Sequence, residues 1–237
     1  KKKKQKAADH SYGLGIYKVV GKYFLNEDPE EIFENTPRIN GETVEGKWTQ
    51  ALLTNEERAL YKSLLKLDEV HKFHDIAKVD VGIVTGANKF FLVPNEVVHE
   101  YGLAKFAHPM FGRSEHCPGL IYDEKQHQAN AEKGNPTNFI LIKDELSKLP
   151  KKVKEYIALG ESEKLHTRYK CRIRKPWYTV PSVYSTKIGM LKRSHDIPKL
   201  ILNNAEAYTT DTAYRITPKE NIAADKLVFC FLTALTA

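Results

Sequence analysis

The pattern of hydrophobic and polar positions predicts helices and short strands that are mixed along the chain. Alternation or short apolar runs between turn residues predict strands at 11–25, 119–122, 139–142, 168–180, 199–203 and 212–217. Helical spacing and capping signals predict helices at 54–67, 95–102, 144–160 and 221–237. Because this order has no βαβ rhythm, we expect an α+β fold with mixed, largely antiparallel twisted sheets and flanking helices.

Two of these elements carry specific local signals. Thr54 and Glu57 form a capping box, in which the threonine side chain accepts an N–H of the first helical turn and the glutamate reaches back. Residues 79–93, VDVGIVTGANKFFLV, predict a hairpin of two half-buried strands around a Gly-containing turn. The sequence predicts no helix directly after the turn, and we therefore do not expect a phosphate-binding loop of the usual kind. Its tip residues are either structural or suited to contact a nucleic acid: Thr85, Asn88 and Lys89.

The chain is expected to form one domain over residues 11–237, in one piece or as two lobes of about 11–145 and 146–237. Residues 1–10 are a basic tail with lysines at five of its first six positions, and we expect it to be flexible or an artificial addition. The chain ends on apolar residues without a stop signal, which predicts that the natural polypeptide continues past Ala237.

The distribution of charge distinguishes one segment from the rest of the chain. The net charge is +7, but without the tail lysines the rest of the chain carries only about +2. Residues 164–195 contain no Asp or Glu, although acids are common elsewhere. The cations of this acid-free segment are Lys164, Arg168, Lys170, Arg172, Arg174, Lys175, Lys187, Lys192 and Arg193. A local positive field of this kind suits a polyanion.

Within this segment, RYKCRIR at 168–174 alternates basic and apolar residues. In a strand, this alternation places four cations on one face and three apolar side chains on the other. KPWY follows, in which Trp177 is expected in the core and Tyr178, on the opposite face, can stack on a base. Arg113, in the loop at 112–115, is a further candidate for base or phosphate contact. The alternative for the strand is a solvated edge whose charges prevent aggregation.

Residues with catalytic or metal-ligating spacing are missing from the sequence. The pair at His116 and Cys117 matches no zinc motif, and the GxG at 13–15 runs into a predicted strand instead of opening a helix. No carboxylate cluster of the kind that a nuclease needs is evident. We therefore expect no catalytic residue, no metal and no cofactor in this chain.

Cysteine spacing and hydropathy indicate the cellular compartment of the protein. Cys117, Cys171 and Cys230 are widely spaced and form no CxxC, which predicts free thiols in a reducing, cytoplasmic setting. No apolar stretch reaches the roughly 18 residues that a spanning helix needs, so no membrane partner is expected.

Three blocks of the sequence resemble one known family. They are GIVTGANKFF at 82–91, RKPWY at 174–178, and PKLILNN at 198–204 with TDTAYR at 210–215. In the same order, they are similar to the region that follows the catalytic domain in class I adenine-N6 DNA methyltransferases of restriction–modification systems. The resemblance covers residues 48–230.

The resemblance implies a C-terminal target recognition domain that binds double-stranded DNA sequence-specifically in a prokaryotic cytoplasm. Its partner would be the catalytic domain of the same parent chain, which binds S-adenosylmethionine and flips the adenine. This sequence lacks the cofactor Gly motif and the Asn-Pro-Pro-Tyr motif, so we expect no methylation by this chain alone. The alternatives are a stand-alone nuclease and an RNA-binding or protein-interaction module.

Overall fold

The computed structural model describes residues 14–15, 26–35, 38–39, 52–193 and 198–236. The predicted flexible tail at 1–10 and most of the strand region predicted at 11–25 lie outside these residues. The chain divides into two compact units, residues 1–71 and 72–237, so residues 145 and 146 belong to the same unit.

The first unit contains short elements in its described part: β1 (Leu14–Gly15) paired antiparallel with β2 (Arg38–Ile39), α1 (Pro29–Asn35) and α2 (Asn55–Leu64). The capping box of α2 is confirmed. The Thr54 hydroxyl accepts the N–H of Glu57 at 3.2 Å, and the Glu57 carboxylate accepts the N–H of Thr54 at 2.8 Å. Two orphan N–H groups at the start of α2 are thus satisfied.

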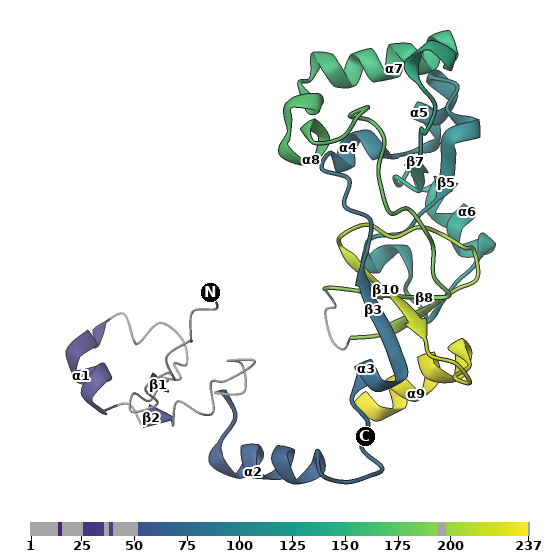
Figure 1. The fold of residues 1–237 in the computed structure, drawn as a ribbon. Helices are drawn as coiled ribbons and strands as arrows, with labels where there is room; N and C mark the ends of the chain where they lie inside the picture. Colours follow the sequence, from purple (N-terminus) through teal and green to yellow (C-terminus); the bar gives the residue numbers. More distant parts are fainter. Residues whose placement is uncertain (1–13, 16–25, 36–37, 40–51, 194–197, 237) are drawn as a thin grey trace, which may run out of the picture. The chain divides into compact units, whose positions relative to one another are not determined.

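The second unit is built on a five-stranded sheet with the strand order β3-β10-β8-β9-β6 (Figure 1). Its strands are β3 (Ala77–Val81), β10 (Ala213–Pro218), β8 (Ile188–Leu191), β9 (Leu200–Asn203) and β6 (Ile121–Tyr122). All neighbours are antiparallel except β6 and β9. The strands predicted at 119–122, 199–203 and 212–217 are confirmed.

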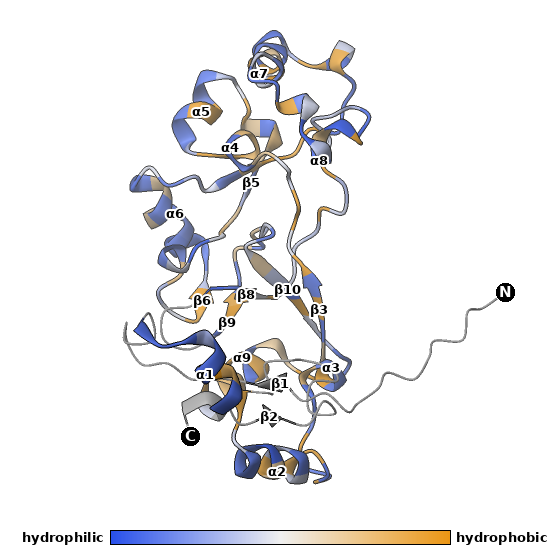
Figure 2. Ribbon diagram, turned by 90° about the vertical axis from the view of Figure 1, so that its left-hand side faces the viewer, coloured by the Kyte–Doolittle hydropathy of each residue, from blue (hydrophilic) through white to orange (hydrophobic). Residues whose placement is uncertain are grey.

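Helices and loops cover the two faces of this sheet. On one face, α3 (Phe73–Ile76) and α9 (Ala224–Thr236) pack on apolar residues of the strands, including Ile188 and Ile216. On the other face, Phe111 and Tyr122 fill a second cluster with Leu191. In Figure 2, β6, β8 and parts of α9 have hydrophobic colours, whereas α6 (Glu124–Glu132) is largely hydrophilic. The predicted C-terminal helix is confirmed.

A second, three-stranded antiparallel sheet has the order β4-β7-β5. It lies with α5 and α7 toward one end of the unit, and the five-stranded sheet lies toward the other (Figure 1). Its elements are β4 (Leu92–Val93), β7 (Asn138–Ile140), β5 (Ala107–Pro109), α4 (Asn88–Phe91), α5 (Asn95–Glu100) and α7 (Lys151–Ser162). The mixed, largely antiparallel sheets with flanking helices confirm the α+β fold.

The hairpin predicted at 79–93 is wrong. β3 pairs with β10 in the larger sheet, and β4 pairs with β7 in the smaller one. Between β3 and β4, Asn88–Phe91 form α4. The cause is the packing of Phe90 and Phe91, which are both buried, with Phe90 stacked on Tyr156 at 4.5 Å between ring centroids. Gly86 does adopt the left-handed backbone, with φ of 81°, that the predicted reversal required.

The chain segments around Ile83 and Thr210, which lie next to β3 and β10 of the larger sheet, cross as a parallel β-bridge, and Met110, directly after β5 of the smaller sheet, forms a second parallel bridge with Tyr208. The Ile83 N–H donates to the Thr209 carbonyl at 2.8 Å, and the Ile83 carbonyl accepts from Asp211 at 3.0 Å. Gly82 allows this approach, since a Cβ there would lie 1.9 Å from the Thr210 carbonyl oxygen. This crossing positions both pockets described below.

Candidate nucleic-acid interface

The acid-free segment begins with helical turns, and the strand predicted at 168–180 is wrong. The 3-10 helix η7 (Leu165–Thr167) is followed by α8 (Tyr169–Arg172). The buried Cys171 and the close approach of Lys170 to Gly86, where an added Cβ would lie 2.6 Å from the lysine Cβ, show how α8 packs on the neighbouring loop. The cations at 168–174 therefore do not share one face.

Arg174 binds the loop that precedes α4. Its two terminal nitrogens donate to the carbonyls of Thr85 and Val84, both at 2.7 Å. Burial lowers the pKa of Arg174, but a guanidinium stays charged in proteins, so its positive charge remains at this position. Carbonyls satisfy its N–H groups without neutralising its charge.

Arg215 is the most buried cation of the region, at 6 % exposure. Its guanidinium donates twice to the Val81 carbonyl, at 3.1 and 2.8 Å, and once to the Ser182 carbonyl at 2.9 Å. The Tyr184 ring covers it, with the guanidinium carbon 3.6 Å from the ring centroid. No carboxylate of the described residues forms an ion pair with Arg215 within 4.0 Å, so the groups in direct contact with its guanidinium are carbonyls and the Tyr184 ring.

These two arginines border a concave site of about 580 Å³, which we call the basic groove. It lies between α8 with the segment that follows it and the edge strand β3, and Lys170 and Lys175 supply two further, exposed cations. Val81 and Ile173 provide part of its apolar wall. No Asp or Glu is among its lining residues. Four cations around a concave surface without a lining carboxylate create a local positive field of the kind that suits a polyanion.

A nearby acid on β3 is engaged by other groups. Asp80 forms an ion pair with Lys78 at 2.8 Å and accepts a hydrogen bond from the Tyr184 hydroxyl at 2.9 Å. The hydrogen bond from Lys78, followed by that from Tyr184, lowers the pKa of Asp80. The contacts also hold the segment at Tyr184 against the sheet edge, beside the groove.

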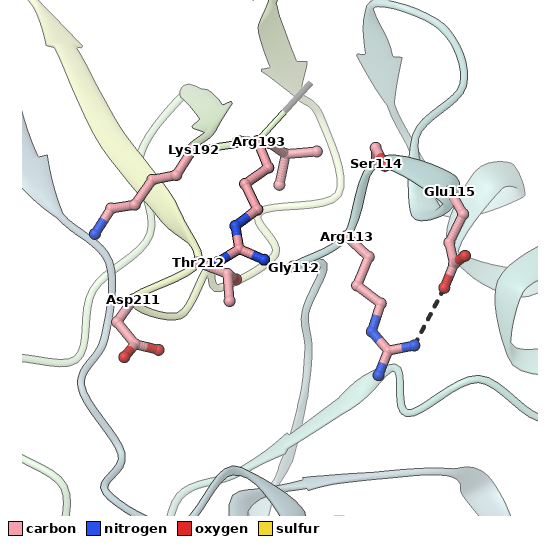
Figure 3. Close-up of a pocket in the computed structure, with 9 residues that line it drawn as sticks. Gly112, Arg113, Ser114, Glu115, Lys192, Arg193, Asp211 and Thr212 are labelled. Atoms are coloured by element: carbon pink, nitrogen blue, oxygen red, sulfur yellow. Dashed lines mark hydrogen bonds and ion pairs between the residues drawn. The ribbon is translucent and has the colours of Figure 1, made fainter. Parts of the chain in front are cut away.

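A second concave site of about 590 Å³, the mixed pocket, lies beside the C-terminal end of β8 (Figure 3). One wall is the loop Gly112–Glu115, in which Arg113 and Glu115 form an ion pair at 3.3 Å. The other wall contains residues 191–193 with Asp211 and Thr212. Lys192 extends over the Tyr214 ring, with its nitrogen 4.8 Å from the centroid. Each wall thus carries at least one cation and one carboxylate.

Several residues predicted to contact DNA are placed differently. Thr85 is fully buried, and its hydroxyl bonds to Asn88 and accepts the N–H of Ala87 at 3.2 Å, so it stabilises the start of α4. Tyr178 is 3 % exposed and donates to the Asp144 carbonyl at 3.2 Å. As folded, neither side chain is accessible from solvent, and their contact with DNA stays a prediction. Trp177 is half-buried against Phe90, with ring centroids 5.0 Å apart.

The other predicted residues are on the surface. Asn88 is exposed but bonded to Thr85, and Lys187 is exposed with an ion pair to Glu206 at 3.7 Å. The other cations that were predicted to contact DNA and are exposed are Lys89, Arg113, Arg168, Lys170, Arg172, Lys175, Lys192 and Arg193. Sequence reasoning missed Arg215 and Asp211. The signal for Arg215 was a charged residue within the apolar strand at 213–216.

The described part of the chain holds neither a candidate metal cluster nor a membrane-spanning helix. No group of three or more His, Cys, Asp or Glu side chains in it could hold a metal ion. Its helices include none with the length and apolar character needed to cross a membrane.

Comparison with protein families defines the class of protein, which is the C-terminal domain of a methyltransferase of restriction–modification systems. The match covers residues 45–237, and the chain belongs to the family described as Type II methyltransferase M.Eco57I, C-terminal domain. Comparison with curated proteins finds no significant match. The resemblance carried by the three sequence blocks is confirmed at the level of this family.

Proposed function

We propose that this chain binds double-stranded DNA sequence-specifically and is the target recognition domain of an adenine-N6 DNA methyltransferase. S-adenosylmethionine and the transfer of the methyl group belong to the catalytic domain of the parent polypeptide, which is the second partner of this chain. The observation that carries the proposal is the basic groove, in which four cations meet without a carboxylate.

Phosphate contacts explain why such a groove suits a duplex. Each phosphate that is neutralised by a cation releases counterions, which makes the binding free energy salt-dependent. Lys170 and Lys175 are exposed and free to reach phosphates, whereas Arg174 and Arg215 hold their own loops and contribute charge at fixed positions. Arg168 and Arg172, the N-cap and the last residue of α8, are further exposed cations outside the lining of the groove.

The test is the affinity of the chain for duplex DNA, measured by fluorescence anisotropy over a range of salt concentrations. The double variant Lys170→Ala/Lys175→Ala should bind more weakly, with a log-log salt slope reduced by about 0.9 for each phosphate contact removed. The matched control is Lys151→Ala/Lys152→Ala on α7, which also removes two exposed lysines.

The control variant should keep the wild-type slope and affinity. Equal losses in both double variants would mean that only net charge matters, and the groove would not be the binding site. Equal wild-type affinity for double-stranded RNA of the same sequence would contradict the preference for DNA.

A further inference from the structure

The mixed pocket differs from the basic groove by its carboxylates. Glu115 lies on one wall and Asp211 on the other, beside the cations of the two walls. A phosphate oxygen beside either carboxylate would meet like charge, which is repulsive at close range. A surface for the DNA backbone therefore extends poorly into this pocket. A ligand that offers both donors and acceptors fits it better.

Base edges in the major groove are ligands of this kind. Guanine presents two acceptors, O6 and N7, which an arginine can contact with two N–H groups, and cytosine presents the N4 amino group, which a carboxylate accepts. The mixed pocket offers both kinds of group from opposite walls (Figure 3).

Arg113 is suited to the guanine contact. Its Nη1 donates to the Glu115 carboxylate at 3.3 Å, and its other guanidinium nitrogens form no hydrogen bond with the described residues (Figure 3). Both side chains are well exposed, at 65 % and 62 %, so a large ligand can reach them. Because the ion pair restricts the arginine rotamers before binding, less side-chain entropy is lost when a base is bound.

Asp211 is suited to the amino group. Its backbone N–H is fixed to the Ile83 carbonyl at 3.0 Å, and the flanking hydroxyls of Thr210 and Thr212 bond each other at 3.0 Å. Within the described residues, its carboxylate forms no hydrogen bond and no ion pair. An exposed acceptor on a fixed backbone is the arrangement that base discrimination requires.

We propose that the mixed pocket reads base edges, with Arg113 donating to guanine O6 and N7 and Asp211 accepting from cytosine N4. Glu115 is a positioning residue that holds Arg113. The inference rests on the proposed function, since it assigns specificity to one part of the same DNA-binding surface, and it divides the labour between a groove for phosphates and a pocket for bases.

The test is selection of a randomised duplex library on the complete chain, followed by sequencing. The wild type should enrich a motif that contains guanine and cytosine. Arg113→Ala should lose the guanine preference at one position by roughly 5- to 150-fold, and Glu115→Ala should weaken it at the same position. Asp211→Asn should shift one position from cytosine toward adenine, because an asparagine pairs with adenine N6 and N7.

Lys151→Ala is the control, and it should leave every position of the motif unchanged. Enrichment by the wild type with the same motif in all variants would overturn this inference and leave the proposed function standing. A uniform fall in affinity without a change at any single position would also overturn it, since it would make Arg113 a phosphate contact. The absence of any enrichment by the wild type would overturn the proposed function and this inference together.

Discussion

Replacement of Gly82 by alanine tests the crossing of the chain segments around Ile83 and Thr210. The new Cβ would lie 1.9 Å from the Thr210 carbonyl oxygen and 2.9 Å from that of Thr209. Both atoms are backbone, so no rotamer change relieves the clash, and one segment must move away from the other. That movement disrupts three backbone hydrogen bonds, donated by Gly82 to Ala213, by Ile83 to Thr209 and by Asp211 to Ile83.

The expected cost follows from these contacts. Overpacking costs about 1–3 kcal/mol, and each lost hydrogen bond costs about 0.5–1.5 kcal/mol. The free energy of unfolding should therefore fall by about 3–7 kcal/mol, which is a large part of the roughly 5–15 kcal/mol of a typical domain. Urea unfolding monitored by circular dichroism measures this change as a lower midpoint at an unchanged slope.

Gly119→Ala is the matched control, because a Cβ at Gly119 would meet no atom within 4 Å. It should change the free energy of unfolding by less than about 0.5 kcal/mol. A Gly82→Ala variant as stable as this control would refute the argument that close backbone contact at the crossing stabilises the second unit.

Two further predictions concern buried polar groups. Tyr156→Phe should lower the free energy of unfolding by about 1–3 kcal/mol, because it leaves the Phe90 carbonyl without the 2.6 Å hydrogen bond; a change near zero in urea unfolding would contradict this. Burial lowers the pKa of His116 and His127 below the ordinary 6.5, so the unfolded chain binds protons that the folded chain does not. Stability should be full above about pH 6.5 and fall on acidification, measured as urea midpoints from about pH 7.5 to 5.5; constant midpoints would contradict it.

The sequence predicted the elements whose periodicity or capping is strong. The capping box before α2 and strands β9 and β10 are confirmed, since local signals and tertiary packing agree there. The strand predicted at 168–174 is wrong because the alternation of residues there suits a strand. The helix α8 has only four residues and is too short to display a helical period. Its fold depends on packing against Gly86, which is distant in sequence.

The candidate site was predicted only in part. Lys170, Arg174 and Lys175 follow from the acid-free segment, and all three line the basic groove. Arg215 and Asp211 come from a different part of the chain and join the two sites only through the pairing of β10 with β3 and the bridge at Ile83. Such placement depends on sheet register, which the local sequence does not specify.

The bridge between Ile83 and Thr210 also affects the spacing of the basic groove and the mixed pocket. Residues next to it on one segment, Val81 and Gly82, line the basic groove, and Asp211 on the other segment lines the mixed pocket. The interval between the two sites is thus set by main-chain hydrogen bonds instead of flexible side chains. If the groove binds a phosphate and the pocket binds a base edge, this fixed spacing sets the register of the duplex. A duplex shifted by one base pair would keep the contact at one site and lose the contact at the other.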